Sequence, residues 1–157
     1  MFRKMRRIKQ EVSKEECEKI LNEERRGVLS MLGEGGYPYG VPINFKYEDG
    51  KIYFHGAKQG HKIDALKAND HVCFTVYNKG YLEEGKRGLN VTSVIVFGTV
   101  RFVEDVDEAY KRCKSLGLKY FPDEPDYIED DAQRLKKVVQ ILELNIDHMT
   151  GKLINES

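Results

Sequence analysis

Residues 41–67 read VPINFKYEDGKIYFHGAKQGHKIDALK, and this stretch decides which folds the chain can form. Two strand-like runs, residues 41–47 and 51–55, are joined by Glu48-Asp49-Gly50, which is a strong hairpin signal. Residues 61–69 then have the composition of a short helix. The stretch therefore predicts an antiparallel hairpin that leads directly into a strand-to-helix junction.

Strands dominate the middle of the chain. Further strands are expected over residues 28–32, 71–77, 91–103 and 140–147, and helices after the capping box that begins at Ser13, after Asp105 and over 130–137. That makes about six strands, connected mostly as hairpins, with too few helices between them for a doubly wound parallel sheet. We expect a mainly β fold, a six-stranded antiparallel barrel with peripheral helices, formed by a single domain over residues 1–157.

The longest apolar run, VTSVIVFGTVRFV at 91–103, does not alternate cleanly between apolar and polar residues. It predicts a strand whose two faces are both covered. Gly98 inside it indicates a bend or the close approach of another group. A chain of this length cannot easily cover both faces by itself, so an association surface is expected on residues 91–97.

Composition excludes several classes of protein. The chain has 26 basic and 26 acidic residues, so no net charge steers it toward nucleic acid or membranes. Its three widely spaced cysteines predict a reducing compartment and argue against a disulfide framework or a zinc site. We expect a cytoplasmic protein with no metal. The basic start, MFRKMRRIKQ, has no apolar segment after it and is interpreted as a tail; a nucleic-acid-binding arm is the weaker alternative.

The junction between His55-Gly56 and His61-Lys62 combines histidines, lysines and glycines, with Lys58 between them. The spacing is one residue short of a nucleotide-binding P-loop, and the dinucleotide fingerprint is missing. What remains is a phosphate held by cationic side chains and by the first amides of the helix. The alternative is that Lys58, His61 and Lys62 are ordinary surface residues.

Several segments together carry a family resemblance: GYPYGVPINF, the hairpin into IYFHGA, the HKIDAL helix, the CFTVY strand and SVIVFGTV. In their order and separations they resemble the flavin-binding split barrels, the superfamily of pyridoxamine 5′-phosphate oxidase. Within that superfamily the chain looks most like the branch related to 5-nitroimidazole reductases, the nitroimidazole-resistance proteins. The resemblance covers nearly the whole chain and implies an FMN cofactor.

The resemblance also implies where FMN is held. The strand Val41-Pro42-Ile43-Asn44-Phe45 matches the one whose backbone lines the isoalloxazine ring. His55, Gly56 and Ala57 match the strand end that meets the flavin and its ribityl chain. His61 and Lys62 match the family's phosphate-binding Arg-Lys pair, with Lys58 in the same loop, and Ser93-Val94 match a position at the pyrimidine edge.

The implied activity is flavin redox chemistry on a small electron-poor acceptor such as a nitro-aromatic, with His55 as the catalytic proton donor. The last arginine is Arg134, so the C-terminal arginines of vitamin B6 oxidases are missing and pyridoxamine phosphate oxidation is disfavoured. A flavin- or haem-binding protein without catalytic activity is the alternative. Tyr37, Tyr39 and Phe45 are candidates to stack on the flavin, although strand aromatics are usually core residues. His148 is a weaker candidate near the cofactor, and His71 is interpreted as a surface residue.

The resemblance finally implies a homodimer with a flavin site at each side of the interface, in which Ser93 reaches the flavin of the other chain. The expected partners are a small-molecule electron donor, an acceptor and a second copy of the chain, with no nucleic acid and no membrane.

Overall fold

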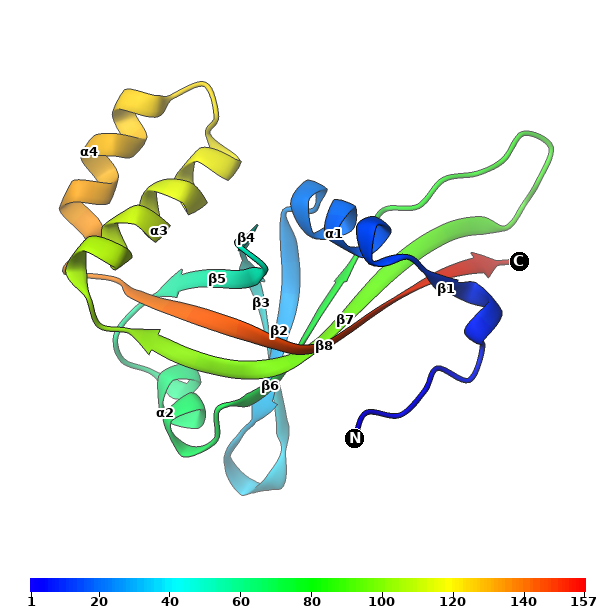
Figure 1. Cartoon of the computed structure of the whole chain (residues 1–157), viewed down its shortest axis with the longest axis horizontal. Helices are drawn as coiled ribbons and strands as arrows, with labels where there is room; N and C mark the ends of the chain where they lie inside the picture. The colour runs from blue at the N-terminus through cyan, green and yellow to red at the C-terminus, as the bar shows by residue number, and fades with distance from the viewer.

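A computed structural model describes all 157 residues of the chain. One antiparallel sheet of eight strands forms the body, and four α-helices lie outside it (Figure 1). The helices are α1 (Lys14–Glu23), α2 (His61–Ala68), α3 (Val106–Tyr120) and α4 (Pro125–Leu135), and the strands are β1 (Glu11–Val12), β2 (Arg26–Leu32), β3 (Pro38–Asn44), β4 (Lys46–Glu48), β5 (Lys51–Gly56), β6 (His71–Tyr77), β7 (Leu89–Val103) and β8 (Gln140–Glu156). Two of the eight strands, β1 and β4, are only two and three residues long, and the six longer strands match the expected barrel class. No helix combines the length and the apolar character needed to cross a membrane.

The order of the strands leaves the barrel open along one line. The sheet runs β3-β2-β6-β7-β8-β5-β4, so β3 and β4 are its two edges. β4 pairs with β5 only from Lys51 to Tyr53, and residues 54–56 of β5 have no partner on that side. The free edge of β3 and this free part of β5 therefore border a gap in the sheet, which we call the seam. Continuing the β4–β5 register by two residues would place Asn44 opposite His55 across it.

The seam exists because the expected strand over 41–47 is interrupted at Phe45. The Phe45 amide donates a hydrogen bond to the Tyr120 hydroxyl (2.8 Å), and its carbonyl accepts one from the Lys119 amine (3.0 Å). The Phe45 ring is fully buried and packs edge-on against Phe74, with ring centroids 4.9 Å apart. Side chains of α3 thus satisfy a backbone that a neighbouring strand would otherwise pair. The prediction of one continuous strand is wrong for this reason.

Local signals were reliable where they depend on neighbouring residues. The β4–β5 hairpin turns through Asp49 and Gly50, which both have positive φ (52° and 72°), as a two-residue hairpin loop of type I′ requires. Ser13 caps α1 by accepting a hydrogen bond from the Glu16 amide (3.1 Å), and Asp105 caps α3 in the same way. α4 begins earlier than expected, at Pro125 rather than near residue 130, because proline suits the first turn of a helix.

The apolar strand β7 has one buried face and one partly exposed face, and it contains the close approach expected at Gly98. The side chains of Val94 and Val96 are fully buried in the barrel, whereas Ile95 and Phe97 point outward and are 38% and 39% exposed. Within one chain the strand has a partly exposed outer face, and its coverage by a second copy stays a prediction. Gly98 marks a register shift against β8, and a Cβ there would overlap the carbonyl oxygen of Asn145, as expected for a close approach.

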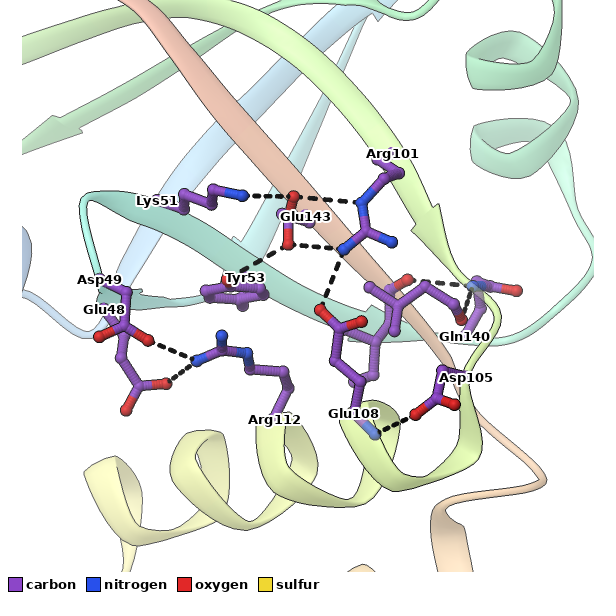
Figure 2. A network of polar contacts seen from close by, with 12 residues as sticks. Glu48, Asp49, Lys51, Tyr53, Arg101, Asp105, Glu108, Arg112, Gln140 and Glu143 are labelled. Carbon is purple, nitrogen blue, oxygen red and sulfur yellow. Dashed lines mark hydrogen bonds and ion pairs between the residues drawn. The ribbon is translucent and has the colours of Figure 1, made fainter.

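A buried carboxylate fastens α3 to the sheet. Figure 2 shows Glu143 of β8 between Lys51 and Arg101, with Tyr53 beside it. Glu143 is only 2% exposed. Its carboxylate accepts hydrogen bonds from the Lys51 amine (2.9 Å), the Tyr53 hydroxyl (3.3 Å) and two nitrogens of Arg101 (2.8 and 3.2 Å). Arg101 also reaches Glu108 on α3 (3.0 Å).

A second arginine extends the same contact. The guanidinium of Arg112 on α3 lies over the Tyr53 ring (4.1 Å to the centroid) and binds Glu48 (2.6 Å) and Asp49 (3.1 Å) at the β4–β5 turn (Figure 2). Buried charges are tolerated only when they are paired in this manner. Together the two arginines hold the first half of α3 against β5 and β8.

Glu143→Gln should destabilise the fold by about 3 kcal/mol, because it leaves Arg101 and Lys51 without their buried partner. Hydrogen bonds from Arg101 lower the pKa of Glu143 to about 2. Since the folded-state pKa lies below the unfolded one, this stabilisation is complete above about pH 4.5 and disappears as the pH falls toward 2. Urea unfolding at pH 7 and pH 3 measures both effects. Glu108→Gln, which removes only the more exposed contact of Arg101, is the control; an equal loss in both variants would contradict the prediction.

Candidate functional site

The walls of the seam are backbone on one side and the end of β5 on the other. Tyr39, Val41 and Ile43 of β3 pack their side chains against the core. Consequently Val41, Pro42, Ile43 and Asn44 can line the seam mainly through the backbone of the free β3 edge, as the family resemblance implies. Phe45 lies beneath this edge with its ring fully buried, so its proposed stacking role is excluded.

His55 lies where the seam meets a cavity. The side chains of Lys51, Tyr53 and His55 alternate with the core residues Ile52 and Phe54, and they face α3 and α4. The cavity has a volume of about 400 Å³ and is bordered by Asn44 of β3, by His55 of β5 and by the α3–α4 pair. We call it the hairpin cavity. In Figure 1 the two helices stand over the end of β5.

Apolar side chains of the two helices form most of the wall of the hairpin cavity, and polar groups are gathered on the strand side. The helix residues that contribute are Cys113, Leu116, Gly117, Tyr120, Tyr127, Ile128, Asp131, Ala132 and Leu135, with Phe121 from the connecting loop. Arg25 and Arg26 complete the lining at the start of β2. Burial raises the pKa of the Cys113 thiol to about 11, so this cysteine is a poor nucleophile.

Lys62 lies over Gly56, the residue that follows His55 in β5. A Cβ on Gly56 would be 2.9 Å from the Lys62 amine, so the amine sits directly over the glycine. Lys62 forms no ion pair, and burial lowers its pKa. A half-buried cation without a carboxylate partner is a suitable ligand for an anion.

The surroundings of His55 shift the pKa of its imidazole. Desolvation beside the α3–α4 pair lowers the pKa of His55, although the residue is still exposed at the surface; the positive charge of Lys62 lowers the pKa further, and Asp131 of α4 opposes the shift. The structure therefore unites His55, Gly56 and Lys62 as predicted, and it adds Asp131. A histidine with a perturbed pKa beside a cavity is typical of a functional site.

The remaining residues of the predicted phosphate loop are arranged differently. α2 begins at His61 after Gly60, whose φ of 128° favours glycine, and no side chain caps its first amides. His61 is stacked on Tyr39 with ring centroids 4.1 Å apart, and Ala57 is exposed in the loop. Lys58 lines another cavity, of about 150 Å³, together with Lys136 and Lys137. Lys58 thus borders a separate cavity, and its role beside Lys62 stays a prediction.

Ser93 and Val94 do not approach the seam of their own chain. They lie on β7, three strands away from β3 in the sheet. Val94 is fully buried in the core, so its side chain cannot contact a cofactor. Ser93 is on the outer face, opposite Tyr77 and Lys152.

The other histidines are also outside the seam. His148 lies on the outer face and stacks on Phe2 of the N-terminal arm, with centroids 4.6 Å apart. His71 is exposed and contacts Asp70 (2.9 Å), which agrees with its interpretation as a surface residue.

Sequence reasoning missed the residues that α3 and α4 bring to the site. Tyr127 and Asp131 are four residues apart and both line the hairpin cavity, which is the spacing of one helix face. Pro125 could have revealed this, because it indicates a helix that starts early enough to include Tyr127. Nothing near Arg25 or Arg26 in sequence shows that these residues border the same cavity as His55.

A model of the pyridoxamine 5′-phosphate oxidase family matches residues 13–153 of the chain. The chain belongs to this family. No curated protein sequence matches it.

Several solved structures share the fold. A provisionally assigned 5-nitroimidazole antibiotic resistance protein from Bacteroides thetaiotaomicron is 28% identical over 92% of this chain and 87% of that one, with a TM-score of 0.80. A flavocytochrome from Azotobacter vinelandii is 18% identical over 96% and 72% of the two chains, with a TM-score of 0.80. An FAD-binding protein from Mesorhizobium loti is 24% identical over 92% and 96%, with a TM-score of 0.64. The last two similarities establish the fold alone.

The imidazole of His55 should titrate below the ordinary histidine value of about 6.5 in a pH series followed by NMR. Lys62→Met should raise the His55 pKa, because it removes a neighbouring positive charge, and Asp131→Asn should lower it further. Lys58→Met is the control and should leave the titration unchanged. If Lys58→Met and Lys62→Met had equal effects, the arrangement described for the two lysines would be refuted.

Proposed function

We propose that this family member is an FMN-dependent oxidoreductase that reduces a small electron-poor acceptor such as a nitro-aromatic. The observation that carries the proposal is the seam, which has free backbone edges along its sides, an unpaired lysine over Gly56 and, next to it, a histidine that borders a cavity. The 28% identity to a nitroimidazole-resistance protein supports the choice of acceptor.

The residues present fit a flavin mononucleotide. A planar ring with polar edges needs backbone donors and acceptors, which the unpaired edge of β3 offers without an adjacent strand. A phosphate needs a cation and free amides, and Lys62 and the uncapped start of α2 are neighbours. Because Gly56 has no side chain, the Lys62 amine can lie directly over it. One phosphate subsite of this kind favours FMN.

In the proposed mechanism the chain positions and protonates, and the bound flavin supplies the transfer of electrons from a donor to an acceptor. Lys62 would hold the phosphate, and the β3 edge would orient the ring. The α3–α4 pair stands beside the His55 side of the seam, where His55 stays exposed to an incoming acceptor. His55 would hand a proton to the reduced acceptor from its imidazole. Because its pKa is lowered, turnover that needs this proton should decrease as the pH rises through the pKa of His55.

Two alternatives are weighed against specific residues. Pyridoxamine phosphate oxidation is disfavoured because the last arginine, Arg134, is engaged with Asp131 on α4. A flavin- or haem-binding protein without turnover remains the second candidate, since several relatives of this fold are named for FAD or haem binding. Turnover separates this candidate from the proposal.

The purified chain should bind FMN with a flavin absorbance spectrum, and NADH or NADPH should bleach it under anaerobic conditions until a nitro-aromatic is added. Lys62→Ala should weaken FMN binding at least ten-fold, or about 1.4 kcal/mol, because it removes the cation of the phosphate subsite. Fluorescence titration with FMN measures the affinity, and Lys58→Ala, in the separate cavity, should have a smaller effect.

His55→Ala is the complementary variant. It should retain most of the FMN affinity and lose acceptor turnover, since the imidazole is placed beside the cavity rather than at the phosphate subsite. Unchanged FMN affinity in Lys62→Ala would refute the phosphate subsite. Turnover that survives in His55→Ala would refute the proton-donor role.

We further propose that the working unit is a homodimer formed through the outer face of β7. Ile95 and Phe97 are large apolar residues exposed near the centre of the sheet, which favours a protein contact. Ser93 lies on the same face, so a second copy packed there could bring its seam toward Ser93. This would explain a serine that is remote from the seam of its own chain.

Ile95→Asp should convert the dimer into a folded monomer with weakened FMN binding, as measured by light scattering and flavin titration. Val94→Asp is the control: its side chain is buried in the barrel, so circular dichroism should show unfolding instead. A folded Ile95→Asp monomer that binds FMN with native affinity would refute the proposal that the flavin site needs residues of both copies.

A further inference from the structure

We infer that the hairpin cavity binds a flat, mainly apolar molecule that carries a carboxylate or a similar oxyanion at one end. This inference deepens the proposed function, on which it rests for its catalytic meaning: the physiological acceptor would be an anionic aromatic compound rather than a neutral one. The binding itself is a property of the cavity and can be tested without turnover.

The first argument is an excess of positive charge at one end of the cavity. Arg25 and Arg26 both line it, and neither has a carboxylate within ion-pair distance. The Arg25 guanidinium lies over the ring of Tyr120 (5.1 Å to the centroid), which orients it at the cavity wall. Arginine stays charged at any physiological pH and can bind a carboxylate with two parallel hydrogen bonds.

The second argument is that the only lining carboxylate does not cancel this charge. Asp131 is the one acidic residue that borders the hairpin cavity, and it contacts the guanidinium of Arg134 on its own helix. This contact partly offsets the charge of Asp131, which still acts on His55. The Asn44 side chain, opposite Arg26 in the β2–β3 register, adds an amide at the same end.

The helices give the hairpin cavity an apolar wall. Leu116 of α3 and Ile128 and Ala132 of α4 are buried residues that also border the cavity. A Cβ on Gly117 would be 2.9 Å from two carbons of Ile128, so the helices are in direct contact and this wall cannot easily close. A volume of about 400 Å³ lies in the range of small-molecule sites. An apolar wall facing two unpaired guanidiniums matches an amphipathic anion.

The positions of His55 and the two arginines define how a bound anion would be oriented in the cavity. His55 and Asn44 border both the seam and the cavity, and Arg25 and Arg26 line the cavity where β2 begins, with Arg26 opposite Asn44. An anion held by the arginines would place its apolar body along the helices and turn one edge toward His55. That edge is where an acceptor would receive electrons and a proton under the proposed function.

The test compares 2-naphthoate with 2-naphthamide, which have nearly the same shape but differ in charge. Isothermal titration calorimetry on the full chain, saturated with FMN, should show naphthoate binding at least ten-fold more tightly. Arg26→Gln and Arg25→Gln should each reduce this preference, and the double variant should abolish it. Arg87→Gln, an exposed arginine outside the cavity, should leave the preference unchanged.

Equal binding of the two probes, absence of binding, or an unchanged preference in the double arginine variant would each overturn the inference. Displacement of naphthoate by FMN would also overturn it, because the cavity would then belong to the flavin. These results are distinguishable from failure of the proposed function. A chain that prefers naphthoate but shows no flavin reduction retains the anion site and loses the redox role, and the reverse result loses only the anion site.

Discussion

The backbone of Phe45 is held by side chains of a distant helix, and the open seam depends on this contact. Tyr120 accepts from the Phe45 amide, and Lys119 donates to the Phe45 carbonyl and to the Leu21 carbonyl (3.3 Å) at the end of α1. The Lys119 amine also lies 3.8 Å from the centroid of the Phe45 ring. Each hydrogen bond contributes about 1 kcal/mol, but a buried backbone group left unpaired would cost more. The chain can therefore break between β3 and β4 without a penalty, and the barrel stays split.

The same helix is fixed at both ends, which makes the hairpin cavity a stable feature. Arg112 and the Glu143 network hold the first half of α3, and Lys119 and Tyr120 hold its last turn. Burial lowers the pKa of Lys119 to about 8. The Lys119 amine is held by two carbonyls and an aromatic ring, and it has no carboxylate partner. Close contact with α4 at Gly117 transmits this fixed position to Tyr127 and Asp131. The helix pair beside His55 is consequently held in place by side-chain contacts along α3.

Electrostatics couples Lys62 to the neighbouring His55. Lys62 and His55 are close enough for the lysine charge to lower the pKa of the imidazole, in addition to the effect of burial. Lys62 therefore suits an anion, whereas His55, whose pKa is lowered, suits a group that accepts a proton. An anion bound at Lys62 would offset the lysine charge and raise the His55 pKa. Cofactor binding and proton supply would be linked in this way through a single charge pair.

By itself, the sequence determined what depends on neighbouring residues. The Asp49-Gly50 turn, the Ser13 and Asp105 caps, the short helix after His55-Gly56 and the grouping of these residues with Lys62 all follow from local conformational preferences and short spacings, and the structure confirms them. Only the tertiary structure decided the break at Phe45, the outward direction of Ile95, the separation of Lys58 from Lys62 and the meeting of Arg26, His55 and Asp131 around one cavity. Those features arise where segments far apart in the chain satisfy one another's backbone groups, bury one another's side chains and share one another's charges. No local pattern encodes such contacts, because their free energy exists only after the barrel has brought the segments together.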